Sequence, residues 1–334
     1  MLIAIWLTGQ GLLDAQTRTT ESQWNSVPQS QHKPQKSTDA ETQFLQLTRD
    51  AAGKPKALQT SITRYQSADG KVMVDLVGAV HIGEKKYFQQ LNKQLSQYDV
   101  VLYELVAPKG TRIPTGGRQG GSTNPLSWMQ GSMKNMLGLE SQLELIDYQS
   151  KNFVHADLSP TELSEKMSER GDNMFTLGLS AFSEMMENQA KMAEKMKANP
   201  NSGISQQMDF GSIMELINNP LELKRMMASQ FTTSGAMEMG LGKKLNQLIV
   251  TDRNKAAMKV LKSQLDRNKK RIAIFYGAAH MPDFEKRLVK DFGMKKAQHV
   301  WVDAWDLKTA PRKKSSEFSE LGSLFMKLMD SIDQ

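Results

Sequence analysis

Two short stretches of the sequence have the form Gly-x-x-His, and each follows an apolar run. "VGAVHIG" contains Gly78 and His81, and "YGAAHMP" contains Gly277 and His280. The chain has five histidines in all, so two of them share one local setting. An imidazole can act as a general base or bind a metal near neutral pH. These two histidines are therefore candidates for the catalytic or metal-binding residues of the protein.

Each motif is followed by a predicted helix, a predicted strand and a carboxylate. Glu104 lies 23 residues after His81, and Asp303 lies 23 residues after His280 (104 − 81 and 303 − 280). This internal repeat predicts two strand–helix–strand units. Ligands bind at the carboxyl ends of the strands in open α/β sheets, so both histidines and at least one carboxylate are expected in one cleft. The glycine of each motif would let the backbone turn tightly or approach a ligand.

Two histidines and a glutamate suit a divalent cation such as zinc, manganese or cobalt. Such a cation would supply hydroxide near neutral pH. Without a metal, one histidine would be the general base and Glu104 would orient it. Both routes give hydrolysis of an amide or an ester, and the spacing does not separate them. In the structural alternative, the histidines cap helices and Glu104 is a surface carboxylate at a strand end.

The hydrophobic pattern predicts an α/β (α+β) fold. We expect two strand–helix–strand half-units that form one mixed sheet around a central cleft. Short β-branched and apolar runs predict strands at 57–66, 70–83, 98–106, 271–280 and 297–307. At 152–160 a short strand is expected to run into a helix that starts at Ser159-Pro160. Apolar residues at helical spacing predict amphipathic helices at 84–97 and 283–293.

The chain divides into segments of different composition. Residues 1–15 resemble the apolar core of a signal peptide without a basic start, and 16–56 have the polar composition of a disordered linker. A domain at 57–307 would contain a helical insert at about 160–266, and 308–334 would form a basic loop and a helix. The first segment predicts an exported protein, periplasmic or secreted. If it is a core helix instead, the protein is cytoplasmic.

The composition argues against several kinds of chemistry and one class of partner. The chain has no cysteine, which excludes disulfides, thiolate catalysis and cysteine-ligated zinc. Its net charge is +7, but the basic residues lie in short runs such as "DRNKKR" and "PRKKSS". Binding of nucleic acid would need a basic stripe with interleaved aromatic residues, so we expect no nucleic-acid partner.

The two motifs, with Glu104 in "VVLYEL" and Arg253 in "VTDRNKAAM", resemble the TraB/PrgY/GumN family, which includes the Tiki proteins. The resemblance covers roughly residues 57–305 and is weak in the middle. It implies a fold similar to the erythromycin esterases and the haem-binding ChaN proteins. It also implies a metal-dependent peptidase, or a protein that binds a peptide without cleaving it.

By this resemblance, His81, Glu104 and His280 would be the metal ligands or the acid/base set. Arg253 would anchor a substrate carboxylate or stabilise an oxyanion, because its guanidinium is always charged. The alternative for Arg253 is a salt bridge at the start of a helix.

Other side chains are weaker candidates for the site. Asp303 matches Glu104 only through the repeat. Tyr276 would donate to an oxyanion, or else is an ordinary buried strand tyrosine. His155, in "FVHADL", would join the cleft or belong to the core. We assign no role to His32, in the linker, or to His299, inside a strand.

Methionine is concentrated in the middle of the chain, where 15 of the 22 lie between residues 128 and 239. The simplest interpretation is a soft core or a seam between helices. The alternatives are a lid that accepts varied peptides, a membrane-surface face or a homo-oligomer contact. Methionine or histidine could also bind haem, which keeps a non-catalytic haem- or peptide-binding protein as the alternative function.

Overall fold

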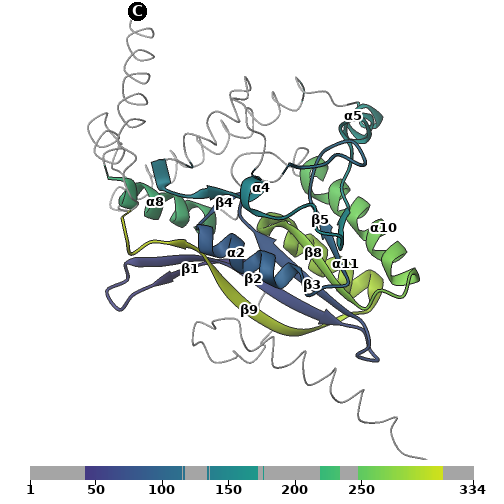
Figure 1. The fold of residues 1–334 in the computed structure, drawn as a ribbon, viewed down its shortest axis with the longest axis horizontal. Coiled ribbons are helices and arrows are strands. Elements are labelled where there is room, and N and C mark those ends of the chain that lie inside the picture. Colours follow the sequence, from purple (N-terminus) through teal and green to yellow (C-terminus); the bar gives the residue numbers. More distant parts are fainter. Residues whose placement is uncertain are drawn as a thin grey trace, which may run out of the picture.

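The computed structural model describes residues 42–114, 136–171, 219–233 and 247–310, together with residues 116, 134 and 176. The described residues form one seven-stranded mixed sheet, a short two-stranded sheet and helices on both faces of the larger sheet (Figure 1). The predicted fold class, α/β (α+β) with one mixed sheet, is confirmed.

The large sheet has the order β9–β2–β3–β8–β5–β7, and β1 lies end to end with β3 along the same edge of β2. The strands are β1 Leu45–Arg49, β2 Pro55–Gln66, β3 Met73–Ala79, β5 Val100–Tyr103, β7 Phe153–His155, β8 Arg271–Gly277 and β9 Lys295–Asp306. A two-stranded sheet joins β4 Ile82–Gly83 to β6 Glu140–Ser141.

Four neighbouring strands, β3, β8, β5 and β7, run parallel to one another. Both β3 and β8 are almost wholly apolar and buried. Parallel strands that are covered on both faces need this kind of sequence, because neither face meets water. At the other side of the sheet, β1, β2 and β9 pair in antiparallel fashion.

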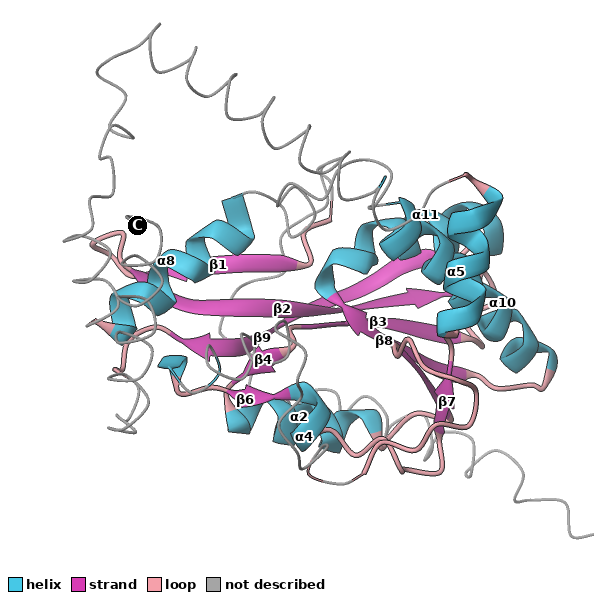
Figure 2. Ribbon diagram, turned by 90° about the horizontal axis from the view of Figure 1, so that it is seen from above, coloured by secondary structure: helices cyan, strands magenta, loops and turns pink. Residues whose placement is uncertain are grey.

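Helices cover the two faces of the sheet (Figure 2). On one face, α2 Lys85–Leu95 buries its apolar stripe, which includes Phe88 and Leu91. On the other face, α10 Arg253–Asp266 and α11 Met281–Phe292 bury side chains such as Leu261 and Phe284. Full burial of each of these side chains contributes about 1.5–3 kcal/mol to folding.

The remaining helices are shorter or lie at the margins of the sheet. They are α4 Gln142–Leu145, α5 Pro160–Glu169, α8 Pro220–Thr233, a π-helix at Gln247–Asp252 and a 3-10 turn at Ala278–His280. The helix α5 starts at the Ser-Pro sequence, as predicted, and its start is a capping box between Ser159 and Glu162. None of the helices in the described part of the chain is long and apolar enough to cross a membrane.

Regular structure within the described residues begins earlier than the predicted domain boundary at residue 57. Residues 16–56 were expected to be a linker, but β1 at Leu45–Arg49 pairs with the first half of β2. Phe44, just before β1, is 4% exposed, and Leu45 and Leu47 pack against the core. These three apolar residues stabilise an edge strand inside a polar sequence. Residues 16–41 lie outside the described part of the chain, as does the predicted signal segment 1–15.

The predicted repeat is correct for its first half only. In the first unit β3 and β5 are parallel, but β8 lies between them. In the second unit β9 is antiparallel to its neighbour β2 at the far edge of the sheet. Glu104 and Asp303 therefore do not occupy equivalent positions in the sheet, and the prediction that Asp303 corresponds to Glu104 is wrong.

The predicted helical insert at 160–266 is described only in parts. Those parts, α5, α8 and the segment from Gln247 to the end of α10, are helical. Part of the Met-rich region between residues 128 and 239, including 182–197, lies outside the described residues, as do residues 311–334 of the predicted tail 308–334. The proposed lid, membrane-surface and oligomer contacts of the methionines stay predictions.

Candidate functional site

The parallel strands bring three of the predicted residues to one edge of the sheet. Ala79 is opposite Gly277 and Tyr103 is opposite Phe275, so β3, β5 and β8 end together. Glu104 directly follows β5, and His280 ends the 3-10 turn that follows β8. His81 follows β3 by two residues. This is the carboxyl edge, where the ends of parallel strands form ligand sites.

Glu104 and His280 face each other at this edge. His280 Nε2 lies 3.5 Å from Glu104 Oε1, and the two side chains are 5% and 12% exposed. The other oxygen, Glu104 Oε2, accepts a hydrogen bond of 2.7 Å from the Gly277 amide. The glycine of the second motif thus supplies a backbone donor to the glutamate that follows the first motif.

The glycine of the first motif has a packing role. A side chain at Gly78 would place its Cβ 3.3 Å from the Ser61 carbonyl oxygen and 3.7 Å from the Cα of Ala278. The end of β3 can therefore lie directly against the turn that carries His280. This close approach follows from the absence of a Cβ atom.

The hydrogen-bond network fixes the tautomer of His280. Asn254 Nδ2 donates to the His280 carbonyl oxygen at 3.0 Å and to Asp283 Oδ2 at 2.9 Å, and both of these partners are acceptors. Asn254 Oδ1 must therefore be the atom that lies 2.7 Å from His280 Nδ1. Because an amide oxygen can only accept, His280 Nδ1 carries a hydrogen. The remaining ring nitrogen, Nε2, faces Glu104.

Arg253 joins two carboxylates beside this pair. Its Nη2 donates to Glu104 Oε1 at 2.7 Å and to Asp157 Oδ2 at 2.6 Å, and its Nε donates to Asp157 Oδ1 at 3.0 Å. Arg253 is the first residue of α10, and the π-helix runs directly into it. π-Helical turns are frequent at functional sites. The salt bridge considered for Arg253 from the sequence is present, and it anchors Glu104.

Electrostatics keeps Glu104 ionised. Burial by itself would raise the pKa of Glu104, but the hydrogen bond and charge of His280 oppose it, as do the charges of Arg253 and His81. The result is a pKa well below the ordinary value for glutamate. A largely buried carboxylate that stays charged can orient a base or bind a cation.

His81 is close to this pair but does not contact it. Its side chain is exposed, and its carbonyl oxygen accepts a hydrogen bond of 2.8 Å from the Gln142 amide. A positive charge on His81 would lower the pKa of Glu104. Among the described residues, no three histidine or acidic side chains are placed together as a metal site would require.

The other predicted residues lie in different surroundings. Tyr276 is fully buried and its hydroxyl donates to the Ala156 carbonyl oxygen, which fits the strand-core alternative. His155 Nε2 donates to the Leu105 carbonyl oxygen at 2.6 Å. Asp303 lies on β9 and accepts a hydrogen bond from Gln59 at 2.5 Å, away from Glu104.

Two residues at the site were not predicted, Asp157 and Asn254. Asp157 accepts from Arg253 and from the amides of Leu105 and Leu158, so it holds the guanidinium in place. It follows the short strand β7 by two residues, as Glu104 follows β5 by one, and an acidic residue just after a strand is a signal that could have identified it. Asn254 follows Arg253 directly, and the sequence contains no signal for its role.

Comparison of the chain with protein-family models, curated proteins and solved structures finds no match. The resemblance to the TraB/PrgY/GumN family stays a prediction that rests on Gly78, His81, Glu104, Arg253 and His280.

Proposed function

We propose that this protein is a hydrolase of amide or ester bonds in which Glu104 and His280 activate water. The observation that carries the proposal is the 3.5 Å approach of His280 Nε2 to Glu104 Oε1, with the tautomer of His280 fixed by Asn254. In the neutral ring, Nε2 is an acceptor that faces another acceptor. Such a pair is stabilised by a proton or a cation between the two atoms, or by a water that donates to both.

Arg253 would contribute to the same chemistry in two ways. It holds Glu104 by a hydrogen bond at 2.7 Å and helps to keep it charged. The Nη1 atom of Arg253 carries two hydrogens. One of them faces the Ile249 carbonyl oxygen at 3.4 Å, and the other has no partner among the described residues. In the proposal this N–H stabilises the oxyanion of the substrate, or anchors a substrate carboxylate.

The donor atoms fit a divalent cation in part. Two ligands of a tetrahedral zinc ion, each about 2.1 Å from the metal, lie roughly 3.4 Å apart, and Nε2 and Oε1 are 3.5 Å apart. The Asn254 contact is the kind of outer hydrogen bond that orients a ligating histidine. Against the fit, Arg253 already donates to the same oxygen of Glu104, and among the described residues no third histidine or carboxylate is placed with the pair.

In our proposal His280, Glu104 and His81 would hold zinc, manganese or cobalt. A bound cation of this kind lowers the pKa of its water and polarises a carbonyl group. By the family resemblance the substrate would be a peptide, and the protein would be exported and of the TraB/Tiki type. A non-catalytic peptide- or haem-binding protein is the second candidate. It is favoured by the hydrogen-bond donors that already engage both oxygens of Glu104.

The test uses the full chain after removal of metal. Zinc, manganese and cobalt are titrated in turn, and hydrolysis of a mixed peptide library and of an activated ester is followed. The variants are His280→Gln, Glu104→Gln and His81→Gln. His299→Gln is the matched control, because His299 lies on β9 and hydrogen-bonds to Thr63, away from Glu104.

We expect the wild type to bind about one equivalent of metal and the control to keep it, whereas the three variants lose it. Turnover should fall by at least about 100-fold in His280→Gln and Glu104→Gln. Hydrolysis that persists in both variants contradicts the proposal. If hydrolysis proceeds without metal, the proposed metal is wrong, but the proposed role of Glu104 and His280 is kept. Peptide binding without any turnover supports the second candidate.

A further inference from the structure

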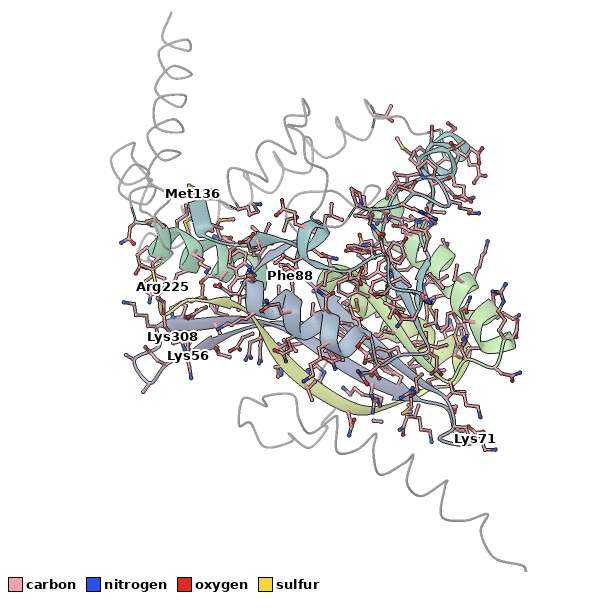
Figure 3. The ribbon with its side chains drawn as sticks, in the orientation of Figure 1. Lys56, Lys71, Phe88, Met136, Arg225 and Lys308 are labelled. Atoms are coloured by element: carbon pink, nitrogen blue, oxygen red, sulfur yellow. The ribbon has the colours of Figure 1, made fainter. Side chains whose placement is uncertain are left out.

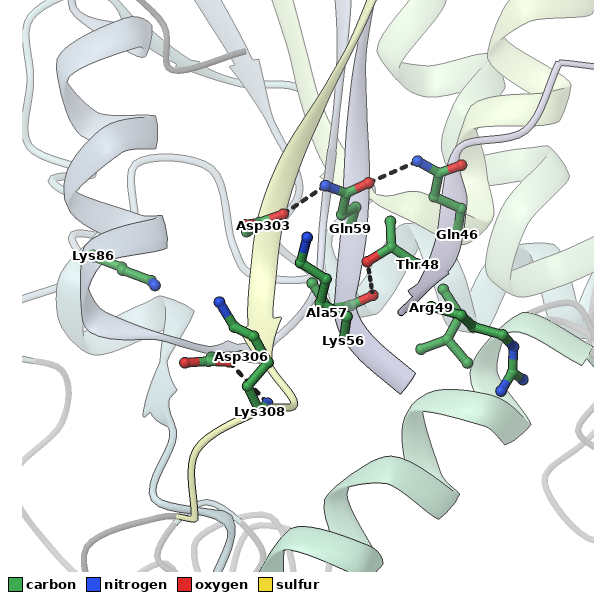
Figure 4. A pocket seen from close by; sticks show the side chains of 11 residues that line it. Gln46, Thr48, Arg49, Lys56, Ala57, Gln59, Lys86, Asp303, Asp306 and Lys308 are labelled. Carbon is green, nitrogen blue, oxygen red and sulfur yellow. Dashed lines mark hydrogen bonds between the residues drawn. The ribbon is translucent and has the colours of Figure 1, made fainter. Parts of the chain in front are cut away.

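A pocket of about 350 Å³ lies where β1, β2 and β9 meet the first turn of α2 (Figure 4). Of the residues considered above for the site, it contains only Asp303. Six charged side chains line it: the cations Arg49, Lys56, Lys86 and Lys308, and the carboxylates Asp303 and Asp306. In Figure 3, Lys56 and Lys308 lie close together at one end of the molecule, far from Lys71.

Two β-bulges meet at this pocket. Between β1 and β2, Thr48 pairs with Ala57 and Arg49 pairs with Pro55, which leaves Lys56 as an extra residue. Between β2 and β9, Leu58 pairs with Trp305 and Gln59 with Asp303, which leaves Ala304 as an extra residue. A bulge bends a strand and redirects its side chains, and bulges are common beside functional sites. Here the irregular pairing sets the position of Lys56 in the pocket.

A chain of hydrogen bonds crosses the sheet at the pocket. Gln46 Nε2 donates to Gln59 Oε1 at 2.7 Å, and Gln59 Nε2 donates to Asp303 Oδ1 at 2.5 Å (Figure 4). Gln59 is 2% exposed. This chain ties Asp303 to the sheet and gives the pocket a polar wall.

The lysines of the pocket are compensated only in part by its carboxylates, since the charges of Lys308 and Lys86 help to lower the pKa of Asp306. In the described part of the chain, no carboxylate lies within ion-pair distance of Lys56, Lys86 or Lys308. Asp306 instead accepts from the backbone amide of Lys308 at 2.9 Å. Four cations against two carboxylates leave an excess of two positive charges. The four cations are exposed at the pocket, and like charges gathered there repel unless an anion comes between them.

We propose that this pocket binds the phosphate group of a phosphomonoester, either a free molecule or a phospholipid headgroup. The dianion matches the excess of two positive charges, and lysine ammonium groups bind phosphate as point charges. The volume of about 350 Å³ is at the lower end for small-molecule sites. The inference is independent of the proposed hydrolase.

The test measures binding by the full chain at fixed ionic strength. The probes are inorganic phosphate, glycerol 3-phosphate, and phosphatidylcholine vesicles with or without phosphatidic acid. The pocket variant combines Lys56→Gln, Lys86→Gln and Lys308→Gln. Its control removes the same charge from three exposed lysines outside the pocket, with Lys71→Gln, Lys93→Gln and Lys290→Gln.

We expect the pocket variant to bind the phosphorylated probes at least about tenfold more weakly than the control variant. Asp303→Asn should have the opposite effect, because it removes a repelling charge and keeps the oxygen that faces Gln59. Tighter binding by Asp303→Asn cannot arise from loss of folding. Binding of glycerol 3-phosphate alone identifies a free ligand, and binding of phosphatidic acid vesicles alone identifies a lipid headgroup. Equal binding by the pocket and control variants, or no binding of any probe by the wild type, overturns the proposal.

Discussion

Arg253→Met should destabilise the protein strongly, because Arg253 neutralises two buried carboxylates. The side chains of Arg253, Asp157 and Glu104 are 10%, 0% and 12% exposed. Removing one partner of a buried ion pair costs about 3–5 kcal/mol, since the other charge stays buried without compensation. Asp157 keeps two backbone donors, the amides of Leu105 and Leu158. We therefore expect the lower end of the range, about 3 kcal/mol.

The assay is equilibrium unfolding of the full chain in urea. Arg253→Lys should give a smaller loss, because it keeps the charge but not the planar fork that reaches both carboxylates. Asp157→Asn in the Arg253→Met background should restore part of the stability by removing a buried charge. The coupling between the two positions, measured by a double-mutant cycle, should exceed about 1 kcal/mol.

A loss below about 1 kcal/mol for Arg253→Met, with no coupling to Asp157, would refute this reasoning. Such a value is typical of an exposed ion pair. It would mean that the guanidinium is well solvated and that the network neither orders Glu104 nor fixes its charge.

Three further predictions concern strand residues of the two sheets. Gly83→Ala should cost about 1–3 kcal/mol in thermal unfolding, because its Cβ would lie 3.0 Å from Tyr87 Cδ1; unchanged stability would contradict the packing. Burial, together with the charge of Lys296, lowers the pKa of His299 to about 4. Between about pH 4 and 6.5 the unfolded chain then binds more protons than the folded chain. The contribution of His299 to the free energy of unfolding is therefore complete above about pH 6.5 and falls by roughly 3 kcal/mol as the pH drops to about 4. A His299→Gln variant with equally steep pH dependence would contradict this. Asp75→Asn should cost about 3 kcal/mol in urea unfolding, because fully buried Asp75 accepts two hydrogen bonds from Arg64; a loss no larger than that of a surface substitution would contradict it.

The strands and helices around the site could be predicted because their patterns are local. The β-branched runs of β3 and β8 and the apolar stripe of α2 are visible in short windows. The helix predicted at 283–293 corresponds to α11, which ends at Gly293 with a φ of 63°. A left-handed residue at this position is the commonest reason for a glycine after a helix.

The pairing of the strands could not be predicted in the same way. The insertion of β8 between β3 and β5 joins segments that are far apart in the sequence, and no local period encodes it. The same limit explains the wrong equivalence of Asp303 with Glu104. β9 contains the expected apolar alternation, but only its partner β2 decides that it runs antiparallel. β1 was missed because its few apolar residues lie within a polar segment.

The two Gly-x-x-His motifs are alike in sequence but differ in environment, and the difference suggests a division of roles. His280 is 4% exposed and is held by Asn254 on one ring nitrogen, with Glu104 near the other. His81 is exposed, and its influence on Glu104 is electrostatic and not by contact. A buried, hydrogen-bonded imidazole has a fixed direction, whereas an exposed one can change rotamer when a ligand arrives. The pair Glu104–His280 would therefore set the geometry of the reaction, and His81 would complete the site only with a cation or substrate in place.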